Sequence, residues 1–126
     1  MLAMNPQTLV LEEPSAGLDL TAAADLYKFL KSFGSERTII IASHSMEEAA
    51  ELADEILVLS NGEIILSGTP SDIFLNAEKI QSAGLALPQT TELMMNLRRC
   101  GFDIKLSYTL EETKKNIVKL NRRRNS

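Results

Sequence analysis

Two adjacent carboxylates, Glu12 and Glu13, follow a short apolar run and come directly before Pro14. Residues 8–11 are β-prone, and a proline stops a strand because it has no amide hydrogen to donate. Acidic side chains at the carboxyl end of a strand lie at the crevice where α/β sheets bind ligands. One carboxylate can hold Mg²⁺ through water, and its neighbour can orient or polarise an attacking water. Taken alone, the pattern also fits a strand that ends in a solvated acidic turn.

The one histidine of the chain, His44, follows a second apolar run. Residues 38–42 (TIIIA) are mostly apolar and β-branched, which is typical of a strand buried on both faces in a parallel sheet. A histidine just after such a strand, and just before a helix, is expected to point into the same crevice as the two glutamates. A lone histidine there also fits a structural role.

Helical periodicity follows each of these strands. Asp19 is a candidate N-cap for the first helix, and Gly34 is expected to end it. Its apolar positions are Leu26, Phe29, Leu30 and Phe33. Ser45 and Glu48 form a capping-box pattern that opens the second helix, whose apolar stripe is Met46, Ala49, Ala50 and Ala53.

The rest of the chain predicts a hairpin and then three helices. Asn61-Gly62 lies between the apolar runs 56–59 and 63–66, which is a strong hairpin signal. Thr69-Pro70 opens a short helix with Asp72 in its first turn. Pro88 opens the next, and a Thr109–Glu112 capping box opens the last. Their expected apolar faces are Leu93, Leu97 and Cys100, and then Leu110, Thr113, Ile117 and Leu120.

Composition and charge restrict the class of protein. The 126 residues suffice for one domain, and the net charge of −4 divides unevenly, because 9 of the 13 basic residues lie in 98–126. The basic tail Arg122–Arg124 has no interleaved aromatic residues, so a nucleic-acid platform is not indicated. It fits a solvated terminus or a contact with anionic lipid. One cysteine, Cys100, excludes a disulfide framework and is expected to be a small buried hydrophobe.

No apolar run approaches the roughly 20 residues that span a bilayer, and no signal peptide is evident at the N-terminus. We therefore expect a cytoplasmic protein, with binding to a membrane complex left open.

Three segments together resemble the ATP-binding-cassette (ABC) ATPase family over residues 1–75. LVLEEPSAGLD resembles the Walker B motif and the D-loop that follows it. TIIIASHSMEEAAELAD resembles the switch-histidine segment. ILVLSNGEIILSGTPSDIF resembles the hairpin and helix that come next in these ATPases. The resemblance implies ATP and Mg²⁺ as cofactors. It makes Glu12 the metal-associated acid, Glu13 the catalytic glutamate and His44 the switch histidine that contacts the γ-phosphate. It places Ser15, Gly17 and Asp19 in a loop that reaches a nucleotide across a dimer interface.

This sequence departs from the family pattern in several places. Glu12 stands where the family usually has aspartate, which moves the carboxylate by about 1.5 Å and puts the metal position in doubt. Leu20 stands where proline is frequent. Neither G-x-x-x-x-G-K-[ST] nor an LSGGQ-like signature occurs in the 126 residues. We therefore expect a chain that belongs to an ATPase family but is inactive on its own, because it lacks the loop whose backbone amides and lysine bind the nucleotide phosphates.

The expected fold is α/β. Residues 1–76 would form the C-terminal part of an ABC ATPase core, a parallel sheet that lacks the P-loop strand. Residues 77–126 would form a small helical C-terminal extension. In the family the P-loop strand lies between the strands that correspond to 38–42 and 56–59. The resemblance thus predicts unpaired strand edges, exposed Ile and Leu side chains and marginal stability for this chain alone.

GTPSDIF and the following LPQTTELMMNLRRCGFDI resemble the ATPase subunits of energy-coupling factor transporters and their cobalt-type relatives. This implies an importer for a metal ion or vitamin, at the inner face of the cell membrane. The implied partners are a second ATPase subunit, in a homo- or heterodimer, and an integral membrane component, with no nucleic acid. Alternatives are a truncated non-catalytic remnant that acts as a dimerisation module, a generic helical extension, and an ABC protein of repair or translation. The C-terminal appendage argues against the last.

Overall fold

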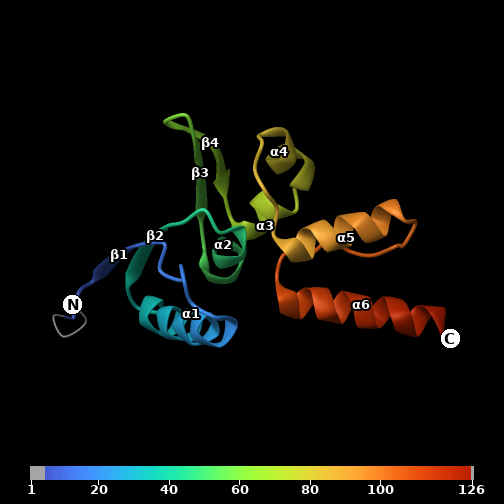
Figure 1. Ribbon diagram of the computed structural model, residues 1–126, viewed down its shortest axis with the longest axis horizontal. Coiled ribbons are helices and arrows are strands. Elements are labelled where there is room, and N and C mark those ends of the chain that lie inside the picture. Colours follow the sequence, from blue (N-terminus) through green and yellow to red (C-terminus); the bar gives the residue numbers. More distant parts are fainter. Residues whose placement is uncertain (1–4, 126) are drawn as a thin grey trace.

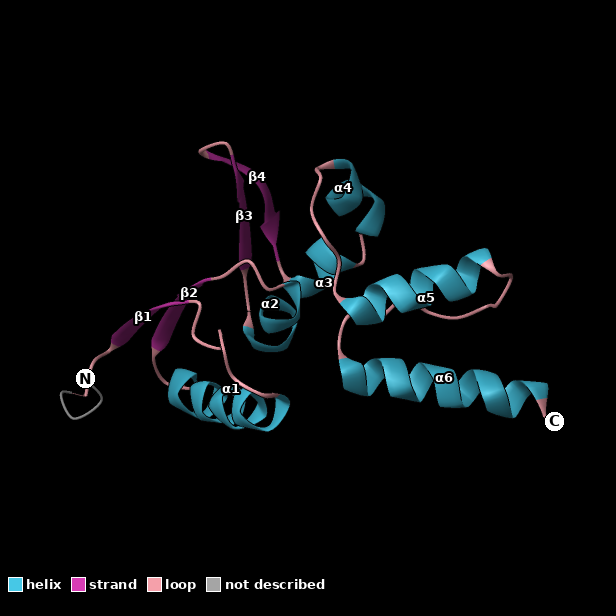
Figure 2. Ribbon diagram, in the orientation of Figure 1, coloured by secondary structure: helices cyan, strands magenta, loops and turns pink. Residues whose placement is uncertain are grey.

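The computed structural model describes residues 5–125 as two small, separate sheets with helices beside them (Figure 1). The elements in chain order are β1 (Thr8–Glu12), α1 (Leu20–Gly34), β2 (Thr38–Ala42), α2 (Met46–Leu52), β3 (Ile56–Ser60), β4 (Glu63–Gly68), α3 (Pro70–Phe74), α4 (Ala77–Ser82), α5 (Gln89–Arg99) and α6 (Leu110–Arg124). The mixed α/β fold predicted from the sequence is confirmed. Figure 2 shows α1 and α2 on the same side of the molecule as the strands, and α4, α5 and α6 on the other side.

β1 and β2 form a parallel pair that spans the predicted motif strands. Thr8 pairs with Thr38 at one end and Glu12 with Ala42 at the other, so the two strands end together. The connection between them contains α1, as a parallel crossover requires. Asp19 caps α1 as predicted, because its Oδ1 accepts the amide of Ala22 at 2.7 Å.

β3 and β4 form the predicted antiparallel hairpin. Asn61 and Gly62 at its turn have φ angles of 52° and 79°, and positive φ at both central residues is what a type I′ turn needs. The register shifts between Val58 and Leu59, so the hairpin contains a bulge that the sequence did not predict. Such a bulge bends the strand and increases its twist.

The prediction that residues 38–42 are buried on both faces is wrong. Ile39 is partly buried against α1, near Gly34, but Ile40 on the opposite face is 54% exposed. β2 pairs only with β1 and β3 only with β4 in the described part of the chain. A strand needs neighbours on both edges and a layer on each face to be fully buried. The predicted exposure of apolar strand residues is confirmed at Ile40, Leu57, Leu59 and Ile64.

A buried apolar cluster lies in the middle of the chain, between α2, β3 and the helices that follow. Its members are Ala50, Val58, Ile73, Phe74, Ala77, Ile80 and Leu87. The cluster therefore contains residues on both sides of position 76. The division of the chain into 1–76 and 77–126 remains a prediction from the sequence.

The region after the hairpin contains four helices where three were predicted. The extra one is α4, a short helix whose N-cap residue, Asn76, makes no side-chain capping bond. A helix of this length without a cap leaves little trace in the sequence. The structure shows no helix in residues 5–125 that is long and apolar enough to cross a membrane.

The predicted buried faces of the last two helices are partly wrong. α5 buries Thr91 and Met94, whereas Leu93 is 45% exposed and Cys100 is also exposed. On α6 only Thr113 is fully buried. Polar contacts fix the two helices, since Thr91 donates to the carbonyl of Ser107 at 2.9 Å and the hydroxyls of Ser107 and Thr113 lie 2.7 Å apart. Thr113 belonged to the predicted face and is buried. Thr91 and Ser107 were not predicted, because the periodicity was judged mainly from apolar residues.

Candidate functional site

The candidate site lies where β1 and β2 end side by side. The amide of Glu13 donates to the carbonyl of Ala42 at 2.9 Å, which continues the strand pairing by one residue. Directly beyond this bond, the chain leaves β1 at Glu13 and leaves β2 at Ser43 and His44. The parallel register therefore brings together residues that are 31 positions apart in the sequence.

The carboxylate of Glu13 accepts hydrogen bonds from three groups. Its Oε1 accepts the amide of His44 at 2.9 Å and lies 2.7 Å from the Nδ1 atom of the same residue. Its Oε2 accepts the hydroxyl of Ser43 at 3.2 Å. Glu13 also has a φ angle of 45°, which is uncommon for a residue with a side chain and recurs at functional sites as well as in turns.

The electrostatics of this pair favour an ionised Glu13. The side-chain hydrogen bond from His44 lowers the pKa of Glu13 most strongly, and partial burial opposes that effect. The amide and charge of His44 and the hydroxyl of Ser43 lower the pKa further. A hydrogen bond to a carboxylate stabilises its charged form, which is why the pKa decreases.

Glu12, the expected metal-associated acid, is the exposed last residue of β1. No group of three or more potential metal ligands occurs in residues 5–125. Mg²⁺ is usually held by one or two carboxylates together with substrate phosphates and waters. The role of Glu12 as the metal-associated acid stays a prediction from the sequence.

The three loop residues expected to bind the cofactor lie between Glu13 and α1. Ser15 accepts a hydrogen bond from the hydroxyl of Tyr27 at 3.4 Å. Gly17 has a φ angle of 78° and open space around the position that a Cβ would occupy. The carboxylate of Asp19 caps α1. The structure thus links Glu13, Ser43 and His44 directly, whereas Ser15 and Asp19 contact α1 and Gly17 is exposed between them.

Sequence reasoning missed Ser43 as a site residue, and its only signal was its place beside His44. The predicted capping box at Ser45 and Glu48 also needs correction. Ser45 accepts the amide of Glu48 at 3.2 Å, but the side chain of Glu48 makes no return bond. That side chain is buried, at 1% exposure, and neither of its carboxylate oxygens has a hydrogen-bond partner.

The helix that follows His44 is tied to the C-terminal helices. The Oε1 atom of Glu47 accepts the amide of Gln89, the first residue of α5, at 3.1 Å. Glu47 lies three positions after His44 in the sequence. This contact joins the element that positions the histidine to the start of α5, and nothing in the apolar periodicity pointed to it.

Comparison with known proteins bears on the family. The chain is 41% identical over 128 residues to the energy-coupling factor transporter ATP-binding protein EcfA2 of Clostridioides difficile, a match that covers 98% of this chain. It is also 41% identical over 114 residues to EcfA of Methanothermobacter thermautotrophicus. The chain is homologous to the C-terminal half of energy-coupling factor transporter ATP-binding proteins.

The match covers less than half of these ATP-binding proteins, 44% of the Clostridioides protein and 37% of the Methanothermobacter protein. A solved structure of cbiO1 from Clostridium perfringens, described as part of the ABC transporter complex cbiONQ, is similar in fold with a TM-score of 0.55 and 35% identity. That match covers 75% of this chain and 38% of the solved chain. No family model matches the sequence.

Proposed function

We propose that this chain supplies the catalytic glutamate and the switch histidine of an ABC ATPase that drives an energy-coupling factor importer. The observation that carries the proposal is the direct contact of Glu13 with His44, 2.7 Å apart at the paired ends of β1 and β2. Phosphoryl transfer needs positioning and electrostatic stabilisation more than covalent chemistry. A fixed carboxylate beside an imidazole is suited to both.

Glu13 would orient the attacking water. A carboxylate has about four lone-pair sites, and the bonds from His44 and Ser43 occupy three of them. The remaining site, on Oε2, can accept a hydrogen of the water. The lowered pKa of Glu13 keeps the carboxylate ionised at neutral pH, so it can act as an acceptor and polarise that water.

His44 would face the phosphate that is transferred. An ionised carboxylate can only accept, so Nδ1 carries the proton in the contact with Glu13. This leaves Nε2 for a ligand, and the side chain is 91% exposed. In its imidazolium form Nε2 donates to a phosphate oxygen. The contact with Glu13 fixes the ring orientation, so the two side chains would act as one unit.

ATP and Mg²⁺ are the cofactors of this proposal, with Glu12 as the metal-associated carboxylate and the metal neutralising phosphate charge. Ser15, Gly17 and Asp19 would lie in a loop at the interface with a second ATPase subunit. The phosphate-binding loop and the signature segment would come from polypeptide that corresponds to the unmatched part of the relatives. Residues 1–126 alone would not hydrolyse ATP, because they contain no G-x-x-x-x-G-K-[ST].

The importer assignment is supported by the relatives named above and by the description of the solved neighbour as part of a transporter complex. We propose a metal ion or vitamin as the cargo, a homo- or heterodimeric ATPase pair, and an integral membrane component as partner. The location would be cytoplasmic, on the inner face of the membrane. Residues 77–126 would be a helical extension of the ATPase core.

The test is ATP hydrolysis after complementation. The chain is co-expressed with the part of the Clostridioides EcfA2 protein that it does not match, and phosphate release from Mg·ATP is measured. Glu13→Gln should lower the rate by about 10²-fold or more, because the amide cannot polarise the water. Glu63→Gln, an exposed acid on β4, is the matched control and should leave the rate unchanged. An undiminished rate for Glu13→Gln would refute the proposed role.

A further inference from the structure

The start of α5 is capped by a side chain from a different helix. The N-cap residue of α5 is Pro88, which makes no side-chain capping bond. The first amides of a helix have no acceptor within the helix and need one from elsewhere. The amide of Gln89 finds that acceptor in the Oε1 atom of Glu47 on α2, at 3.1 Å. A carboxylate is favourable at this end because the helix dipole makes it positive.

The start of α5 is also a firmly held part of the molecule. Leu87 and Pro88, which lead into the helix, are buried, and Leu87 belongs to the central apolar cluster. In the first turn, the buried hydroxyl of Thr91 donates to the carbonyl of Ser107 at 2.9 Å. Glu47 therefore joins α2 to a point that both packing and hydrogen bonds hold in place.

The segment that carries His44 is held by far fewer contacts. Ser43 and His44 are both exposed, and the side chain of His44 is 91% exposed. The amide and the Nδ1 atom of His44 both bond to Glu13. Packing therefore does not orient the imidazole. Its place depends on where β2 ends, at Ala42, and on where α2 begins, at Met46.

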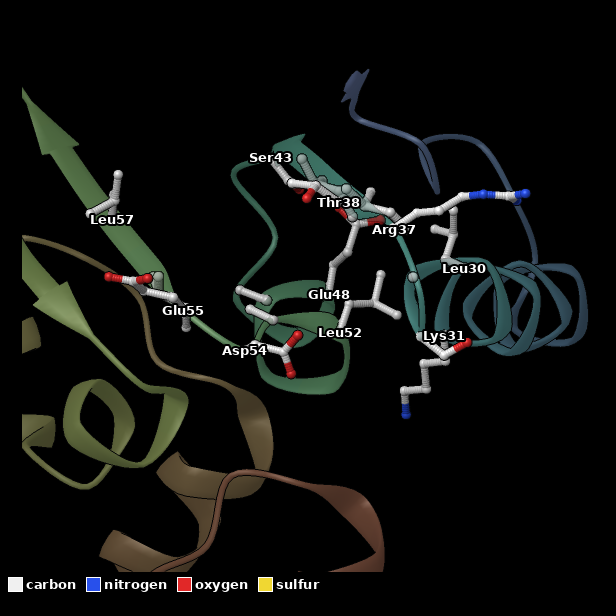
Figure 3. A pocket seen from close by; sticks show the side chains of 17 residues that line it. Leu30, Lys31, Arg37, Thr38, Ser43, Glu48, Leu52, Asp54, Glu55 and Leu57 are labelled. Atoms are coloured by element: carbon white, nitrogen blue, oxygen red, sulfur yellow. The ribbon is translucent and has the colours of Figure 1, made fainter. Parts of the chain in front are cut away.

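Two neighbouring glutamates of α2 reach different parts of the molecule. Successive residues of a helix point about 100° apart, because one turn takes about 3.6 residues. Figure 3 shows the side chain of Glu48 extending from α2 toward β2, whereas the side chain of Glu47 reaches α5. Glu47 lies in the first turn of α2, three positions after His44. Its bond thus holds α2 at the end nearest to the imidazole.

We propose that Glu47 is a positioning residue, which sets the first turn of α2 by accepting the amide of Gln89 and thereby holds the imidazole of His44 with Nδ1 on Glu13. The ring then presents Nε2 to the phosphate. This inference rests on the proposed function for what His44 does, while the dependence of the ring on Glu47 is additional to it. It makes the start of α5 part of the support of the candidate site.

The experiment removes the bond from each side. Glu47→Ala removes the acceptor, and Gln89→Pro removes the donor. Proline suits this place because the first residue of a helix needs no amide hydrogen, and because Pro88 has the extended backbone, with φ −53° and ψ 140°, that a following proline favours. Glu47→Gln keeps an acceptor oxygen and Gln89→Ala keeps the amide, so these two variants are the matched controls.

The first measurement is the tautomer of His44 in the full 126-residue chain, taken from the nitrogen NMR shifts of the imidazole. At about pH 8 the ring is neutral, and its proton should lie mainly on Nδ1, because Glu13 accepts it. Glu47→Ala and Gln89→Pro should each lower the Nδ1–H fraction about twofold or more. The double variant should lower it no further, since both changes break one bond. The two matched controls should keep the unsubstituted tautomer.

The second measurement separates turnover from nucleotide binding in the complex with the unmatched part of the Clostridioides EcfA2 protein. Glu47→Ala and Gln89→Pro should lower kcat about tenfold, because a small misplacement of a catalytic group is costly. KM for ATP should change by less than about twofold, since the bond affects the orientation of His44 and not the grip on the nucleotide. Glu51→Ala, one turn further along α2 where Glu51 pairs with Lys31, should leave both constants unchanged.

The outcomes separate this inference from the proposed function. If the urea midpoint falls in both bond-breaking variants while the His44 tautomer is unchanged, the bond only stabilises α5 and the inference is overturned. If Glu13→Gln lowers hydrolysis as expected but Glu47→Ala and Gln89→Pro alter neither the tautomer nor kcat, only this inference fails. If the tautomer changes but Glu13→Gln leaves hydrolysis undiminished, the proposed catalytic role fails and the positioning of His44 by Glu47 stands.

Discussion

The helical region α3–α6 and the β1–α1–β2 unit differ in how completely they bury their side chains. Phe74, Ile80 and Met94 in the first are at most 1% exposed, and its buried hydroxyls are hydrogen-bonded to one another or to the backbone. In the second only Leu9 and Leu30 are fully buried, and Val10 is 66% exposed. The helical region shares a packed interior with α2 and β3, whereas the unit with Glu13 and His44 presents apolar surface and open strand edges.

This difference shows that bringing the residues of the candidate site together does not require a sheet whose apolar faces and edges are covered. Two parallel strands are enough to bring Glu13 and His44 into contact. They are not enough to cover Val10 and Ile40. We therefore expect substitutions in the helical region to affect stability strongly, and substitutions at exposed strand or helix positions of the β1–α1–β2 unit to affect it little.

The largest expected effect is at Phe74, which is completely buried in the central cluster. Phe74→Ala should lower the free energy of unfolding by about 3 to 5 kcal/mol, because it removes buried apolar surface and leaves a cavity. Phe29→Ala in α1 is the matched control, since Phe29 is 44% exposed, and should cost about 1 kcal/mol or less. Urea unfolding measures both. Equal losses would remove the contrast between the two regions.

A smaller effect is expected at Thr91, whose buried hydroxyl donates to the carbonyl of Ser107 at 2.9 Å. Thr91→Val keeps the shape but leaves that carbonyl without this donor, which should cost about 1 to 3 kcal/mol. Thr21→Val, at an exposed position of α1, should change the free energy of unfolding by about 0.5 kcal/mol or less. A neutral Thr91→Val would show that the hydroxyl contacts do not stabilise the α5–α6 packing.

The smallest effect is the acid titration of Glu13. Because its pKa in the folded chain is lowered from the ordinary 4.5, ionised Glu13 stabilises the fold above that pH and loses this contribution as the pH falls through the folded value. An NMR titration should show the Glu13 carboxyl with a midpoint below 4.5. His44→Ala should move the midpoint upward. A midpoint at or above the ordinary value would mean that the contact with His44 is absent in solution.

Local sequence patterns predicted most helices, strands and turns of this fold. They could not predict which side chains are buried by contacts between distant parts of the chain. Asp19, Ser45 and Asn61-Gly62 act through residues a few positions away, so the sequence was sufficient to place a cap, a second cap and a turn. The burial of Ile40 depends on a layer and on strand neighbours that no local pattern reports. The TIIIA run therefore indicated a strand but not its surroundings.

The candidate site also has a part that the sequence predicts and a part that it does not. Glu13 and His44 could be predicted as neighbours because strands that run parallel end at one edge of a sheet. The third member, Ser43, and the left-handed backbone of Glu13 could not be predicted, because they follow from the geometry of the turn. Glu48 was interpreted as half of a capping box, which is correct for its amide and wrong for its carboxylate.

The hydrogen bond between Glu47 and Gln89 has a mechanical consequence. Glu47 lies in the first turn of the helix that starts two residues after His44, and Gln89 starts α5. If α2 shifts when the imidazole moves toward a ligand, the amide of Gln89 must follow or the bond must break. The contact is thus a short linkage through which displacement of α2 is passed to the start of α5.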